Sequence, residues 1–195
     1  MPASVNRRSV IHRGRVFQLV RENVTLDNGT TTDLDFIEHP GAAAIVALTG
    51  ENDVVLVRQY RHALGQYIWE IPAGTLDPGE LVLDCARREL AEETGYAAAE
   101  WRKLGEITPV PGYSDERIHL FLATGLSAAA QRLDADEVLE AHGRPLAEAA
   151  AMIARGEIQD AKSICALLLA QNWLRRHFHG SGQTDSAAAS CRSGG

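Results

Sequence analysis

A stretch in the middle of the chain, GTLDPGELVLDCARRELAEETGY (residues 74–96), gathers three carboxylates on what its pattern predicts to be one helix. The helix is expected over 81–94, and Gly95 is suited to end it in the left-handed conformation. Glu89, Glu92 and Glu93 then fall within an arc of roughly 100°, and like charges at such spacing repel one another. The repulsion is relieved if the acids bind a divalent cation, because clustered carboxylate oxygens are the ligands that Mg²⁺ and Mn²⁺ prefer. A solvated acidic helix face is the alternative interpretation.

Length and charge narrow the classes to which the chain can belong. Its 195 residues suffice for one sizeable core, and a net charge of −7 argues against an electrostatic grip on nucleic acid. No apolar run approaches the roughly 20 residues that span a membrane, and no apolar signal-peptide segment follows the first arginines. The cysteines, Cys85, Cys165 and Cys191, lack metal-ligand spacing. We therefore expect a cytoplasmic protein without nucleic-acid or membrane partners.

Strands and helices mix along the chain, and its N-terminal part is rich in strand signals. Residues 16–41 alternate apolar and polar side chains around a turn signal at 27–29, which predicts a β-hairpin. Continuous apolar runs predict buried strands over 42–48 and 53–60. The further expected elements are strands over 67–74, 101–110 and 117–126, an acidic loop over 133–140, helices over 145–156 and 160–180, and a disordered Gly/Ser/Ala-rich tail over 181–195.

The acidic stretch also carries a recognisable spacing. Gly74, Glu80 and the run REL-AEETGY that starts at Arg88 match, position for position, the signature of the Nudix hydrolases, so the chain resembles that family. The resemblance implies an α/β fold, a Nudix-type α/β/α sandwich around a mixed β-sheet. It also implies a loop–helix–loop that binds divalent metal over a diphosphate, where the cations neutralise charge and activate water.

Carried over residue by residue, the signature implies a role for each polar group near the helix. Mg²⁺, with Mn²⁺ as a possible substitute, is the implied cofactor. The implied metal ligands are Glu89 and Glu93, with Glu92 beside them and the backbone carbonyl of Ala73 just before the glycine; Arg88 would orient the carboxylates and Glu80 would support the loop.

The sequences flanking the signature, from residue 39 to 173, resemble the ADP-ribose pyrophosphatase branch of the family. Pro111, sixteen residues after Gly95, stands where that branch carries a proline. The implied reaction is hydrolysis of ADP-ribose to AMP and ribose 5-phosphate. Two alternatives stay open: hydrolysis of another nucleotide sugar, such as GDP-mannose or ADP-glucose, and a regulatory module that binds ADP-ribose without cleaving it. Such modules usually lose the acids of the signature, which are all present here.

Three residues before the signature are candidates for substrate binding. Arg58 and Arg61 could clamp phosphates, since a guanidinium offers a forked set of donors. Alternation along the strand predicts that these two arginines point to opposite faces. Glu70 is an acid in a short apolar strand, which requires a partner or a ligand. Trp69, its neighbour, is interpreted as core packing.

Two loops after the signature complete the predicted site. The loop over 111–116 offers Pro111, Gly112, Ser114 and Glu116 as substrate-binding groups, with Gly112 reversing the chain. In the second loop Glu137 stands where the branch places the general base, and Ala135 replaces a frequent glutamate of that loop. Glu140 is the alternative base if the register of the loop shifts.

The branch resemblance further implies a homodimer that acts on a small-molecule nucleotide sugar. Residues 1–40 would be a β-rich segment that crosses to the partner, residues 41–180 the Nudix domain, and residues 181–195 a tail. A short strand-forming segment without a core of its own is stable when a second copy covers it.

Overall fold

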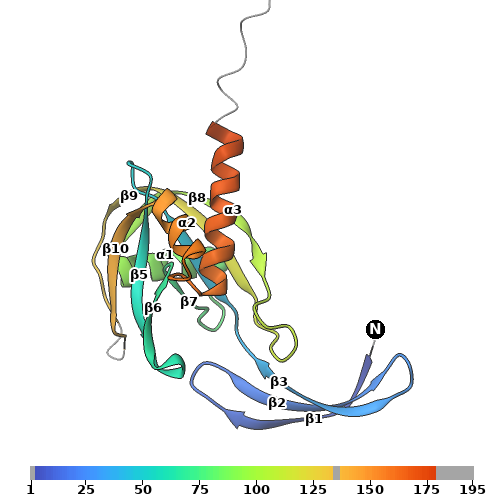
Figure 1. Ribbon diagram of the computed structural model, residues 1–195. Coiled ribbons are helices and arrows are strands. Elements are labelled where there is room, and N and C mark those ends of the chain that lie inside the picture. The colour runs from blue at the N-terminus through green and yellow to red at the C-terminus, as the bar shows by residue number, and fades with distance from the viewer. Residues whose placement is uncertain (1–2, 134–136, 179–195) are drawn as a thin grey trace, which may run out of the picture.

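The N-terminal strands form a sheet of their own. The computed structural model describes residues 3–133 and 137–178, so the predicted tail over 181–195 lies outside the described residues. The antiparallel sheet has the order β1-β2-β3 and extends away from the body of the molecule (Figure 1). Its strands are β1 (Ala3–Arg13), β2 (Gln18–Leu26) and β3 (Thr31–Glu38). The turn between β2 and β3 contains Gly29 at φ 81°, which confirms the predicted hairpin.

The body contains two further sheets. One has four strands in the order β7-β4-β9-β8, in which β4 and β9 are parallel and the other pairs antiparallel. The other is antiparallel, in the order β10-β5-β6. These strands are β4 (Ala42–Ala47), β5 (Asp53–Arg61), β6 (Gln66–Glu70), β7 (Ala73–Thr75), β8 (Tyr96–Ile107), β9 (Ile118–Ala128) and β10 (Leu139–Pro145), with a 3-10 turn η1 (His62–Leu64) after β5.

Helices cover both faces of the central strand β4. The helices are α1 (Val82–Thr94), α2 (Leu146–Ala154) and α3 (Ala161–Phe178). Alternate residues of β4 point to opposite faces: Ala43 and Ile45 pack with residues of α1, whereas Ala44 and Val46 pack with residues of α2 and α3. This arrangement is the predicted α/β/α sandwich with a mixed sheet. None of the helices in the described ranges is long and apolar enough to cross a membrane.

The short strand predicted over 67–74, ended by Pro72 and Gly74, forms as β6 before Pro72, but residues 73–75 form a separate strand, β7, in a different sheet. The break falls at Ile71 and Pro72, and Pro72 has no N–H with which to continue a ladder. The Ile71 N–H instead donates to Ser163 Oγ (2.8 Å), and the Pro72 carbonyl accepts from the Ile45 N–H (2.9 Å). The chain therefore passes from one sheet to the other immediately before Gly74.

The acidic loop predicted over 133–140 is too long at its C-terminal end. Residues from Leu139 onward form β10, which pairs along its whole length with β5. The segment has neither a helical nor an alternating pattern, and only its partner strand, some eighty residues earlier in the sequence, defines it. Residues 134–136 of the loop lie outside the described residues.

The loop over 111–116 connects the N-terminal sheet to the body. Its Ser114 forms a parallel bridge with Ile37 of β3. The Ile37 N–H donates to the Tyr113 carbonyl (2.8 Å), and the Asp115 N–H donates to the Ile37 carbonyl (3.1 Å). The His39 N–H also donates to the Asp115 carboxylate (2.8 Å). The end of β3 is thus bonded to a loop that was predicted to contact substrate.

Candidate metal and substrate site

Helix α1 carries its acids on the side that faces β7. Glu89 and Glu93 are buried, with 8% and 2% of their surface exposed, and Glu92 is half-buried. The helix ends as predicted, with Gly95 in the left-handed conformation at φ 72° and its N–H bonded to the Ala91 carbonyl. Since a buried carboxylate needs compensating donors or a cation, this face of α1 is unlike a solvated acidic helix.

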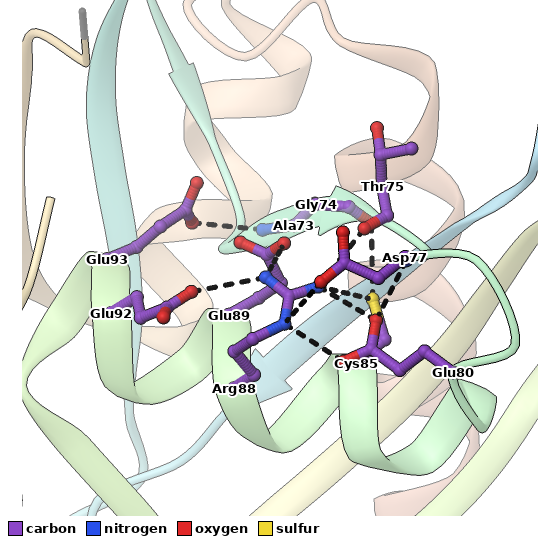
Figure 2. A network of polar contacts seen from close by, with 10 residues as sticks. All are labelled: Ala73, Gly74, Thr75, Asp77, Glu80, Cys85, Arg88, Glu89, Glu92 and Glu93. Carbon is purple, nitrogen blue, oxygen red and sulfur yellow. Dashed lines mark hydrogen bonds and ion pairs between the residues drawn. The ribbon is translucent and has the colours of Figure 1, made fainter. Parts of the chain in front are cut away.

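The carboxylate of Glu89 lies directly over Gly74 (Figure 2). A Cβ atom at residue 74 would be 1.9 Å from the Glu89 Cδ, far closer than any nonbonded contact. The glycine at this position therefore supplies space for the acid, independently of any backbone strain.

Replacing this glycine should displace the acid. For the diphosphate hydrolysis that the Nudix resemblance implies, we expect Gly74→Ala to lower kcat by about 10²-fold, the scale that a misplacement of roughly 1 Å can produce in an active site. The matched control is Gly50→Ala, because nothing lies within 4 Å of a Cβ built at residue 50. Kinetics and circular dichroism of both variants check the prediction, and a Gly74→Ala enzyme with unaltered kcat contradicts it.

Arg88 ties the acids of the helix to the loop that precedes it. It donates to both oxygens of Glu80 (2.9 Å each), to Glu89 (2.6 Å), to Glu92 (3.1 Å) and to the Thr75 carbonyl (3.1 Å). Figure 2 shows the guanidinium at the centre of these contacts. The hydrogen bonds from Arg88 lower the pKa of Glu80 to about 2, so Glu80 stays ionised and holds the guanidinium in place.

The thiol of Cys85 lies beneath the same glycine. Its Sγ is 3.6 Å from the Gly74 carbonyl, to which it donates, and 3.6 Å from an Nη of Arg88, from which it accepts. Burial, followed by the negative charge of Glu89, raises the pKa of this thiol to about 12. The side chain therefore stays a neutral thiol and packs in the core between β4 and α1.

Glu93 and Glu89 lie in buried surroundings that disfavour their ionised forms, so the pKa of each carboxyl group is raised. Burial, then repulsion by Glu89, raises the pKa of Glu93 to about 8, although the Ala73 N–H donates to it (3.0 Å). Burial likewise raises the pKa of Glu89 to about 6, against the opposing effect of Arg88. A nearby cation removes this penalty, because it favours the charged form of both acids. The residues present therefore fit a divalent cation.

The carboxylates of Glu89, Glu92 and Glu93 do not point toward a common position where a cation could bind. Among the residues that the structure describes, no three acidic, histidine or cysteine side chains are arranged to hold a metal ion. Glu89 and Glu92 turn toward Arg88, whereas Glu93 turns toward the Ala73 N–H (Figure 2). Binding of a cation here would require these side chains to rotate away from their present donors.

Glu70 has the partners that its sequence position requires. It is 3% exposed, and it accepts from Arg61 Nε (2.7 Å) and from Lys162 Nζ (2.6 Å). Lys162 also lies 3.1 Å from Asp160, which bonds the N–H and the hydroxyl of Ser163 at the start of α3. Neither Lys162 nor Asp160 is among the site residues predicted from the sequence. The available signal was a lysine at the second position of the helix, directly before the largely apolar run over 164–170, where a lysine that becomes buried needs a charged partner.

The two arginines of β5 point to opposite faces, as predicted. Arg61 bonds Glu70, whereas Arg58 lies 5.0 Å from the ring centroid of Tyr67 on the other face. The structure therefore places only Arg61 beside the buried acid. Trp69 packs partly buried against the core, which agrees with its interpretation as a packing residue.

The predicted loop residues lie at the junction with β3. Pro111 and Gly112 are exposed in the turn. The Ser114 hydroxyl accepts from the Glu116 N–H (3.2 Å), and the Glu116 carboxylate lies 3.6 Å from His39 Nδ1. Both polar side chains are thus occupied within the chain itself.

Glu137 lies close enough to α1 for its charge to affect the pKa values of the acids on that helix. It is half-buried, and its charge contributes to raising the pKa of both Glu89 and Glu93. The alternative base, Glu140, has a side chain that is 74% exposed and lies 3.4 Å from His142 Nε2. Because Glu140 pairs with Arg58 in the ladder, it points to the face away from Arg61.

A mixed-sheet sandwich whose acidic helix follows a glycine at the end of a short strand is the architecture of a Nudix domain. Residues 38–167, two thirds of the chain, match the family described as NUDIX domain. The chain belongs to the Nudix family.

Similarity to individual proteins indicates the branch of the Nudix family that the chain resembles. The ADP-ribose pyrophosphatase of Bacillus subtilis (strain 168) is 40% identical over 159 residues, which cover 80% of this chain and 86% of that protein. The methanol dehydrogenase activator of Bacillus methanolicus is 43% identical over the same length, with the same coverage. A solved structure titled as an ADP compounds hydrolase has the same fold, with a TM-score of 0.79 at 24% identity over 93% of this chain and 97% of that one. The resemblance to the ADP-ribose pyrophosphatase branch is confirmed.

Proposed function

We propose that this protein is a divalent-cation-dependent hydrolase that cleaves the diphosphate of a nucleoside diphosphate sugar. The proposed substrate is ADP-ribose, and the products are AMP and ribose 5-phosphate. One observation carries the proposal: Glu89 and Glu93 are buried side by side on α1 with raised pKa values, an arrangement that a cation stabilises. Relatives named as ADP-ribose pyrophosphatases at 39–40% identity support the choice of substrate.

The residues of the chain divide the proposed work as follows. Glu89, Glu92, Glu93 and the carbonyl of Ala73 would hold Mg²⁺, for which Mn²⁺ could substitute. A divalent cation there supplies neutralisation of the diphosphate charge and lowers the pKa of the attacking water. Glu137 would be the general base that accepts a proton from the attacking water. The proposed substrate contacts are Arg61 and, from the loop, Pro111, Gly112, Ser114 and Glu116, whereas Arg58 lies on the opposite face of β5.

A panel of nucleotide sugars tests the proposal. The purified protein is incubated with ADP-ribose, ADP-glucose or GDP-mannose in the presence of Mg²⁺ or Mn²⁺, and the products are separated by chromatography. We expect equal amounts of AMP and ribose 5-phosphate from ADP-ribose, and no product when EDTA is added. Binding of ADP-ribose without cleavage would instead identify a regulatory module.

We also propose that a second copy of the chain covers the N-terminal sheet. Large apolar side chains are exposed on this sheet and the turn after β1, among them Val5, Ile11, Phe17 and Leu34. Apolar groups gathered on one small sheet mark an interaction surface. Light scattering after gel filtration should give about twice the chain mass of 21.1 kDa. A cytoplasmic location belongs to the same proposal, with Cys85 and Cys165 as free thiols.

A further inference from the structure

A group of charged side chains outside α1 joins β5, β6 and the start of α3. Glu70 is buried at its centre, between Arg61 and Lys162. Lys162 is itself largely buried, with 11% of its side chain exposed, and Asp160 provides its second carboxylate partner. A buried ammonium between two carboxylates has a fixed position, because any movement would leave a buried charge without its partner.

The two cations divide the carboxylate of Glu70 between them. Lys162 Nζ occupies Oε1 at 2.6 Å, and Arg61 Nε occupies Oε2 at 2.7 Å. Arg61 therefore contacts Glu70 through Nε alone, although a guanidinium prefers a two-pronged contact with both oxygens of a carboxylate. Within residues 3–133 and 137–178, its terminal nitrogens make no hydrogen bond, and its side chain is 40% exposed.

We propose that Lys162 is a positioning residue that keeps the fork of Arg61 available for a phosphate group of the substrate. Because Lys162 Nζ occupies Oε1 of Glu70, Arg61 cannot form a bidentate contact with both oxygens of that carboxylate. The terminal N–H groups then remain directed outward, where a diphosphate oxygen can accept from them. Without Lys162 the guanidinium turns inward and pairs with the whole carboxylate. This inference rests on the proposed function and adds to it a residue that would not touch the substrate.

Lys162→Met tests the proposal, because methionine fills a similar volume without the charge. We expect KM for ADP-ribose to rise roughly tenfold, the effect of losing one hydrogen bond to a charged group, while kcat changes less than threefold. In an Arg61→Ala background, Lys162→Met should add less than about twofold, since the group that it positions is gone. A role through long-range charge alone would instead give the same rise in KM in both backgrounds, and would overturn the proposal.

Ser163→Ala is the matched control for a purely structural role. It removes the hydrogen bond from the Ile71 N–H to Ser163 Oγ and the one from Ser163 Oγ to Asp160, and so weakens the same junction between α3 and the end of β6. The Ser163 N–H still donates to Asp160, and the contact of Lys162 with Glu70 does not involve Ser163. We expect a lower melting temperature with KM within twofold of the wild type. If KM rises as much in Ser163→Ala as in Lys162→Met, the effect comes from the weakened junction between α3 and β6 and not from loss of the Lys162 ammonium, which overturns the proposal. If Lys162→Met does not fold, Lys162→Leu, which likewise leaves Oε1 of Glu70 without a donor from residue 162, provides the same comparison.

Binding measurements separate this inference from the proposed function. Calorimetric titration of ADP-ribose in EDTA should show weaker binding to Lys162→Met than to the wild type, without any turnover. Equal affinities would sink the inference whatever the kinetics show. A wild type that binds ADP-ribose but cleaves no nucleotide sugar would sink the proposed function and leave the positioning role of Lys162 intact.

Discussion

Glu93→Gln should lower kcat for ADP-ribose by roughly 10³-fold or more while the protein remains folded. The amide keeps an oxygen that can accept from the Ala73 N–H, which now bonds the carboxylate at 3.0 Å. It lacks the negative charge, however, and charge stabilisation by a bound cation contributes several kcal/mol to such reactions. Steady-state kinetics with Mg²⁺ and calorimetric titration of the cation check the result. A variant with near-normal kcat would show that Glu93 does not hold the metal.

The same substitution should stabilise the metal-free protein at alkaline pH. The pKa of Glu93 is raised from 4.5 to about 8, so its favourable contribution is complete below pH 4.5 and is lost as the pH rises toward 8. Glutamine stays neutral throughout this range. In EDTA at pH 8, we expect Glu93→Gln to melt at least about 2–4 °C above the wild type, the shift produced by ~1 kcal/mol in a chain of this size. At pH 5 the two proteins should melt at similar temperatures, and a constant difference across the range would contradict this account.

Glu137→Gln should lower kcat by roughly 10²–10⁴-fold with little change in KM, the usual scale for removal of a general base. Its charge acts on both Glu89 and Glu93, so it lies near the place where water would be activated. The pH profile of kcat should also lose its acidic limb, which an ionising base produces.

Glu140→Gln is the control for that experiment. It removes the same charge three residues later in the sequence, from a side chain that is 74% exposed and lies beside His142. We expect kcat within twofold of the wild type. If Glu140→Gln were the slower enzyme, the assignment of the base would move from Glu137 to Glu140.

The features that local chemistry determines could be predicted from the sequence. The acids of α1 and its end at Gly95 follow from spacing within one short stretch, and the resemblance to the Nudix signature identifies Gly74 as one of its fixed positions. The opposite orientations of Arg58 and Arg61 follow from the two-residue repeat of a strand. Even the need of Glu70 for a partner could be inferred, because burial of a lone carboxylate is unfavourable.

The features that depend on distant segments could not be predicted. Lys162 lies ninety-two residues after Glu70, and no pattern near either residue identifies the other. The division of 67–74 into β6 and β7 depends on Ser163 and Ile45 as hydrogen-bond partners. The strand β10 is defined by β5 alone, since its own sequence shows no alternation.

The position of Cys85 has a consequence for the oxidation chemistry of the protein. Oxidants and alkylating reagents attack the thiolate, and a thiol whose pKa is about 12 forms almost none at neutral pH. The sulfur is also fully enclosed beneath Gly74 and Arg88. Cys85 contacts two residues of the candidate site and is nevertheless protected from peroxide and thiol reagents by its burial and raised pKa, whereas Cys165 is only partly buried.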